Sequence, residues 1–186
     1  MADLQPHEVI GFWRDAGPAR WFATDAAFDA ACARFVDAHH AAARRELDGW
    51  LASADGALAL VLLLDQIPRN VFRGSAHAFA TDPLALRFAA HAVDAGFDTA
   101  VDPALRVFVY LPFEHSEALD DQQRAVALTE AMAAADPGEA AAMYADYARR
   151  HRDVIVRFGR FPHRNRALGR DSTPDEQAYL DAGGGF

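Results

Sequence analysis

The sequence contains no lysine, so all 18 of its basic residues are arginines. This absence excludes Schiff-base chemistry at a lysine amine and the lysine of a phosphate-binding P-loop. The single cysteine, Cys32, excludes an internal disulfide and favours a reducing compartment. The N-terminal residues lack the features of a signal peptide, and the longest apolar run, residues 57–64, is too short to cross a bilayer. We therefore expect a cytoplasmic protein without a membrane partner.

Several motifs of catalysis and binding are also absent. The sequence holds no Gly-x-Ser-x-Gly, Gly-x-Gly-x-x-Gly or His-Glu-x-x-His pattern. These patterns mark many serine hydrolases, dinucleotide-binding sites and zinc proteases, respectively. We therefore expect no cofactor and no bound metal. The net charge of −9 also disfavours a nucleic-acid partner, because a phosphate backbone attracts basic surfaces.

What the sequence does contain is typical of helices. Its 186 residues suit one domain, and a hydrophobic content of 52% supports a packed core. After a candidate N-cap at Asp25, apolar residues recur at three- and four-residue spacing from Phe28 to Ala43. Residues 57–64 are apolar on every side, as in a helix buried within a bundle. We predict one all-α domain over residues 1–186.

Helix start signals occur at intervals along the chain. An aspartate is followed directly by proline at Asp82, Asp102 and Asp136. Aspartate caps free N–H groups, and proline at the first helical position has no N–H to leave unpaired. We expect Ser116 to open another helix after a bend at Pro112, and Thr173 with Glu176 to form a capping box. These signals predict about seven or eight helices.

Three polar segments depart from the helical pattern. We call residues 64–74 the first polar segment, residues 110–117 the second and residues 157–170 the third. The charge distribution is uneven as well. Residues 149–170 carry a net charge of +7, whereas the rest of the chain carries −16. A scaffold of helices alone does not require such segments.

Each polar segment allows a functional and a structural interpretation. In the first, Arg69 and Arg73 are spaced to share a helix face and hold an anion, or Asp65 pairs with one of them. In the second, His115 and Glu117 suit an anion site, an acid–base pair or metal ligands. Alternatively, Ser116 caps the helix, Glu117 complements its dipole and His115 bonds to a carbonyl.

The arginines of the third polar segment have no acidic neighbours beyond Gly159. They therefore face either acids elsewhere in the fold or an anionic ligand. Two other histidines, His39 and His151, lie in register with apolar residues, and we interpret both as core histidines with satisfied hydrogen bonds. Cys32 lies on the apolar side of its helix and is interpreted as an inert thiol.

These segments resemble a bacterial family, domain-of-unknown-function family 924. The resemblance rests on Phe12-Trp13 with Trp21-Phe22, on LLLDQIPRNVFRG at residues 62–74, on Phe79-Ala80-x-Asp82, on YLPFEHSE at residues 110–117 and on RFGRFPHRNRALGRDST at residues 157–173. Two positions depart from its pattern, because Arg14 replaces an aromatic residue and Glu114 a methionine. The resemblance implies a TPR-like α-α superhelix and no established activity.

Our first functional hypothesis is a pocket that binds a small anionic molecule where the three polar segments converge. Its expected lining is Asp65, Arg69, Asn70, Arg73, His115, Glu117, Arg160, His163, Arg164, Asn165 and Arg170. A second hypothesis is a TPR-like interaction module that grips an acidic peptide. A third is a hydrolase or lyase that uses His115 or His163 with Glu117 or Asp65 as its acid–base pair. The sequence does not decide whether the protein is an enzyme.

Overall fold

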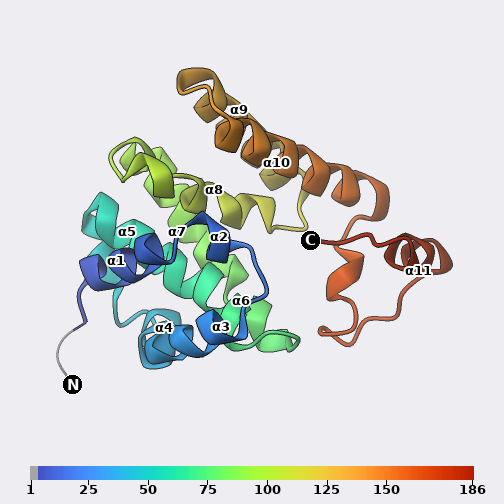
Figure 1. Ribbon diagram of the computed structural model, residues 1–186, viewed down its shortest axis with the longest axis horizontal. Helices are drawn as coiled ribbons and strands as arrows, with labels where there is room; N and C mark the ends of the chain where they lie inside the picture. The colour runs from blue at the N-terminus through green and yellow to red at the C-terminus, as the bar shows by residue number, and fades with distance from the viewer. Residues whose placement is uncertain (1–3) are drawn as a thin grey trace. The chain divides into compact units, whose positions relative to one another are not determined.

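The computed structural model describes residues 4–186, and these residues form helices and turns without a strand (Figure 1). The all-α prediction is therefore confirmed, whereas the TPR-like superhelix stays a prediction. Within the described residues, no helix is long and apolar enough to cross a membrane. The backbone contacts divide the chain into two compact units, unit 1 and unit 2.

Unit 1 holds the chain up to Arg73 together with His77–Pro112. Its helices and 3-10 turns are α1 (Pro6–Ala16), α2 (Pro18–Trp21), α3 (Ala26–Cys32), η1 (Ala33–Phe35), α4 (Val36–Ala43), η2 (Asp48–Ala52), α5 (Ala54–Val61), the π-helical η3 (Leu62–Gln66), α6 (Ile67–Val71), η4 (Ala76–Phe79), α7 (Asp82–Asp94), η5 (Phe97–Thr99) and η6 (Pro103–Leu105). Helix α8 (Val107–Glu114) begins in this unit and ends in the other.

The core of unit 1 is built around α5, which packs against α1 and α7. Residues 57–64 are all buried, as their apolar composition predicts. Aromatic rings fill the space that the small alanine side chains leave open. The Trp13 and Trp21 rings both meet the Phe108 ring edge to face, at centroid distances of 5.5 and 5.1 Å. This core supports α4 and the π-helical turn η3, which pack against each other.

The π-helical turn η3 has a local cause and a structural consequence. The Ile67 N–H bonds to the Leu62 carbonyl, five residues back, and Pro68 has no N–H to donate. The Leu63 and Leu64 carbonyls are therefore available to side-chain donors. Thr81 Oγ1 donates to the Leu64 oxygen, and His39 Nδ1 lies 2.9 Å from the Leu63 oxygen. The π-helical turn at the start of the first polar segment thus leaves two buried carbonyls that bond to the side chains of His39 and Thr81.

Unit 2 comprises Gly74–Ala76 and Phe113–Phe186. Its elements are α9 (Leu119–Ala135), α10 (Glu139–Phe158), η7 (Pro162–Arg164) and α11 (Pro174–Asp181). Helices α9 and α10 pack side by side as a hairpin (Figure 1). Val154, Ile155 and Phe161 form a small apolar cluster, against which Phe158 and Tyr179 pack.

The start signals in the sequence are confirmed where the cap is local. Asp25 accepts hydrogen bonds from two N–H groups of α3, and Thr173 forms the predicted capping box with Glu176. Two details of the second polar segment are wrong. Pro112 lies inside α8 instead of at a bend, and α9 begins at Leu119, three residues after Ser116. The Ser116 hydroxyl accepts the Ala118 N–H and donates to Asp121.

Candidate functional site

The first polar segment lies in unit 1, where carboxylates pair with both of its predicted ligand-binding arginines. The Arg69 guanidinium contacts the buried Asp65 carboxylate at 3.2 Å and binds both oxygens of Asp82 at 2.9 and 3.0 Å. The Arg73 guanidinium binds both oxygens of Asp29 at 2.8 and 2.9 Å. The structural interpretation of Asp65, an ion pair with one of these arginines, is therefore observed.

Asn70 is also used within the segment. Its side-chain amide donates to the Gln66 carbonyl at 3.0 Å and accepts from Arg73 at 3.4 Å. Helix α6 ends at Val71, so Arg73 lies beyond it, and the two arginines turn to different carboxylates. The helix face that the i,i+4 spacing suggested for Arg69 and Arg73 does not form.

Residues 113–117 of the second polar segment meet the third polar segment in unit 2. The Glu117 carboxylate binds the Arg170 guanidinium through two hydrogen bonds of 2.7 and 3.0 Å and accepts the Phe161 N–H at 2.8 Å. Burial opposes the charged form of Glu117. The Arg170 guanidinium and the Phe161 N–H outweigh it and hold the pKa of this carboxyl below its ordinary value. Arg164 donates to the His115 carbonyl at 3.0 Å.

Glu176 connects the remainder of the third polar segment to α11. Its carboxylate binds the Arg160 guanidinium, with one contact at 2.7 Å, and lies 3.3 Å from the Asn165 amide. The Asn165 oxygen in turn accepts from Arg170 at 2.9 Å. The Phe161 ring, at a centroid distance of 5.6 Å, packs beside the ring of His163.

In the structure, the guanidinium groups of Arg160 and Arg170 both face carboxylates elsewhere in the fold, which is one of the two alternatives for the third polar segment. The uneven charge of the sequence is thus compensated by ion pairs between distant residues. Within unit 2, the structure brings residues 113–117 of the second polar segment to the third polar segment. The first lies in unit 1, and a pocket shared by all three stays a prediction.

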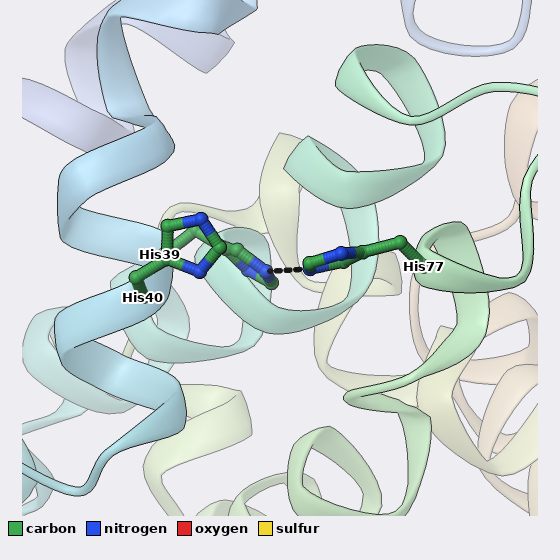
Figure 2. Close-up of side chains that lie close together, drawn as sticks. All are labelled: His39, His40 and His77. Atoms are coloured by element: carbon green, nitrogen blue, oxygen red, sulfur yellow. Dashed lines mark hydrogen bonds between the residues drawn. The ribbon is translucent and has the colours of Figure 1, made fainter.

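A cluster of three histidines in unit 1 is the arrangement best suited to chemistry. His39 and His40 come from α4 and His77 from η4, and Figure 2 shows the three side chains close together, with the His39 ring directed at His77. The Nε2 atoms of His39 and His77 are 3.4 Å apart. Each of the three residues offers one ring nitrogen such that these atoms all lie within 4.8 Å of one another. Within the described residues, this is the one group of three or more potential metal ligands so close together.

Hydrogen bonding fixes the protonation of the central histidine. A carbonyl oxygen only accepts, so the His39 Nδ1 atom must carry a proton to bond to the Leu63 oxygen. Burial lowers the pKa of His39, against the Leu63 hydrogen bond, which raises it; neighbouring His40 and His77 lower it further. The ring is therefore neutral near pH 7. Its Nε2 atom then carries a lone pair directed at His77.

Phe72 forms an apolar wall on this cluster. Its ring stacks on His77 at a centroid distance of 4.0 Å and lies 5.7 Å from His39 and 6.2 Å from His40. His39 is fully buried, whereas His40 and His77 keep part of their surface exposed. The cluster is thus buried at His39 and reaches solvent at His40 and His77.

His39 is buried, which confirms its interpretation as a core histidine, whereas no pattern in the sequence pointed to His40 or His77. The His39-His40 pair is visible in the sequence, but His77 lies 38 residues beyond His39. Only the fold places these residues together. The one usable signal is the proline of the first polar segment, which leaves the Leu63 carbonyl to a side-chain donor.

His151, the other predicted core histidine, is also buried and hydrogen-bonded. Its Nδ1 atom lies 2.9 Å from the Tyr147 carbonyl and 2.9 Å from a carboxylate oxygen of Glu114. Glu114 is one of the two positions at which the sequence is expected to depart from the family that it resembles. The other, Arg14, pairs with Asp102 at 2.9 Å. Both departures therefore have polar partners in this protein.

Comparison with known proteins agrees with the resemblance seen in the sequence. No curated protein matches the chain. A solved structure, that of the protein of unknown function ATU0120 from Agrobacterium tumefaciens, is 53% identical. The match covers 95% of this chain and 97% of that one, with a TM-score of 0.88. The profile of the family described as "Bacterial protein of unknown function (DUF924)" matches residues 9–184. The chain therefore belongs to this bacterial family of unknown function.

Proposed function

We propose that this protein binds a divalent transition metal, with zinc as the best-suited ion, through His39, His40 and His77. The observation that carries the proposal is the 3.4 Å distance between the Nε2 atoms of His39 and His77. Two nitrogens that each lie 2.0–2.1 Å from a tetrahedral zinc ion are about 3.3–3.4 Å apart. The two rings thus already have the spacing of zinc ligands.

The hydrogen bond from His39 to Leu63 supports the same proposal. Metal-binding histidines usually donate their second ring N–H to a carbonyl or carboxylate, which fixes the ring and directs its lone pair at the metal. His39 has this arrangement before any metal is present. His77 binds through the ring nitrogen that faces His39 when its proton lies on the other ring nitrogen, and His40 completes the set by rotating a partly exposed ring.

The choice of metal follows from the ligands. Neutral imidazoles suit zinc, copper, nickel and iron, whereas magnesium and calcium prefer oxygen ligands. The three-histidine set is found in catalytic zinc sites, which keep one position for another ligand. The proposal departs from our expectation of no metal, which rested on the absence of a local zinc motif.

The contacts give less support to the hypotheses based on the polar segments. Four arginines expected to bind an anion are paired with carboxylates: Arg69, Arg73, Arg160 and Arg170. Glu117 and Asp65, the expected acid–base groups, bind guanidinium groups. An acidic-peptide module is likewise favoured by no specific contact. A metal bound at the histidine cluster is the better-supported partner for a small anion in this protein.

Zinc binding can be measured on the full chain carrying no polyhistidine tag, after treatment with a chelator. Competition against a chromophoric zinc indicator at neutral pH should give one site per chain. Because each variant removes one ligand, His77→Ala and His40→Ala should each weaken binding at least ~10-fold.

The matched control is His7→Ala, since His7 lies exposed on α1 and outside the cluster. Circular dichroism of all variants checks that they fold. The proposal is wrong if the parent protein takes up no zinc, or if both cluster variants bind zinc as tightly as the His7 control.

A further inference from the structure

The histidine cluster also specifies what the bound metal would face. We infer that a small exogenous anion completes the coordination of the metal, entering from the side of His40 and His77. This inference rests on the proposed metal site. It names the ligand class of that site: small anions that bind through one atom, with hydroxide as the default when no other anion is present.

The three histidines supply fewer ligands than a zinc ion takes. Zinc and cobalt with histidine ligands favour four-coordinate sites, and catalytic zinc sites supply three of the four positions from the protein. Within the part of the chain that the structure describes, no cysteine, aspartate or glutamate joins the three histidines. The fourth position therefore falls to a molecule from solution.

The charge of the bound metal also favours an anion. Three neutral imidazoles leave the two positive charges of the metal uncompensated. Among the described residues, the group of potential metal ligands at this place consists of histidines alone and includes no carboxylate. Burial of His39 and the Phe72 wall strengthen the attraction between a metal ion and an anion, because they exclude water from one side. An anion is therefore favoured over a neutral ligand.

The surroundings of the cluster restrict the size of a further ligand and the direction from which it approaches. The Phe72 ring is within ring-contact distance of all three histidines, so it restricts the space beside the metal. His39 is closed off by the core, whereas His40 and His77 reach solvent. A ligand must approach over these two outer rings and fit beside an aromatic wall. This favours compact anions over bulky ones.

Cobalt in place of zinc makes the inference measurable, because four-coordinate cobalt has intense visible bands that respond to its ligands. We would load the full chain with one equivalent of Co²⁺ and titrate it with sodium azide, then with benzoate. Azide should shift the bands saturably, and benzoate should bind at least tenfold more weakly. In Phe72→Leu the azide shift should remain and the preference over benzoate should shrink. Phe97→Leu, which alters a partly buried ring outside the cluster, should behave as the parent.

The outcomes separate the two proposals. If the cobalt bands do not appear, both the metal site and this inference fail. If they appear, are lost in His77→Ala and do not respond to azide, the metal site stands and the open anion position is refuted. If Phe72→Leu keeps the parent's preference for azide, the size restriction by Phe72 is refuted.

Discussion

At the scale of the single residue, His39 links the fold to the candidate site. Its ring is buried, its Nδ1 proton is held by the Leu63 carbonyl and its Nε2 atom faces His77. The same burial that fixes the ring makes its protonated form unfavourable in the folded state. The residue therefore couples stability to pH in a direction that can be calculated.

Metal-free protein should lose stability through His39 as the pH falls below 6.5. The pKa of His39 is lowered from 6.5 in the folded state, so below this pH the unfolded chain binds more protons than the folded chain. This destabilisation is absent at pH values above the pKa of His39 in the unfolded chain, and it grows as the pH falls toward the pKa of His39 in the folded protein. His39→Gln, which keeps an amide donor for Leu63, should make the fall of Tm between neutral and mildly acidic pH shallower.

The control for this measurement is His7→Gln, a neutral substitution at an exposed histidine. Its Tm should follow the parent across the same pH range in the presence of a chelator. A His39→Gln profile parallel to that of the parent would show that His39 does not govern the acid sensitivity.

At the scale of the element, the π-helical turn η3 and Pro68 decide where His39 is anchored. Pro68→Ala restores an N–H that can bond to the Leu64 or Leu63 carbonyl within the helix. This donor competes with the His39 ring, so the ring loses part of its orientation. We expect zinc binding to weaken ~10-fold, the scale observed when the partner that orients a metal-binding histidine is removed.

The matched control is Pro83→Ala. Pro83 lies in the first turn of α7, where an N–H has no intrahelical partner in any case. Both substitutions cost about 0.4–1 kcal/mol through the unfolded chain, whereas only Pro68→Ala should change zinc affinity. Equal zinc affinities for the two variants would refute the role of the π-helical turn in orienting His39.

Elements were predictable from the sequence where the cause is local. Asp25 and Thr173 cap helices with their own side chains, so neighbouring residues suffice to place those starts. Ser116 has the same cap-forming chemistry, but the chain between it and Leu119 is held by other contacts, including Gln122, which donates to the Glu114 and Ser116 carbonyls. Nothing in the order of residues specifies those contacts.

The site was less predictable than the fold because its parts are distant in sequence. Glu117 and Arg170 are 53 residues apart, and Arg73 and Asp29 are 44 apart. Composition signalled that the arginines needed partners, but not that carboxylates of the same chain would supply them. Likewise, His77 meets His39 only because η4 packs near α4 after the turn around Phe72.

At the scale of the whole molecule, ion pairs between acidic residues and the basic stretch make the stability of the fold depend on pH. An excess of acidic residues, with a net charge of −9, supplies partners to the basic stretch at residues 149–170. Glu176 is the clearest case, because hydrogen bonding to Arg160, to the Thr173 N–H and to Asn165 lowers the pKa of this carboxyl to about 2. Its hydrogen bonds hold the third polar segment against α11.

Substitution of Glu176 by glutamine should therefore alter acid denaturation. A carboxyl with a depressed pKa contributes stability above its unfolded value of about 4.5, and this contribution is lost as the pH falls toward about 2. Glu176→Gln should lower Tm near pH 7. It should also flatten the decline of Tm between about pH 4.5 and about pH 2, because glutamine keeps an acceptor oxygen but cannot ionise. The exposed Glu139→Gln serves as the control of equal charge change. If both variants show the same decline as the parent, the ion pairs that neutralise the basic stretch add nothing to stability, and its arginines would again be candidates for binding an anionic partner.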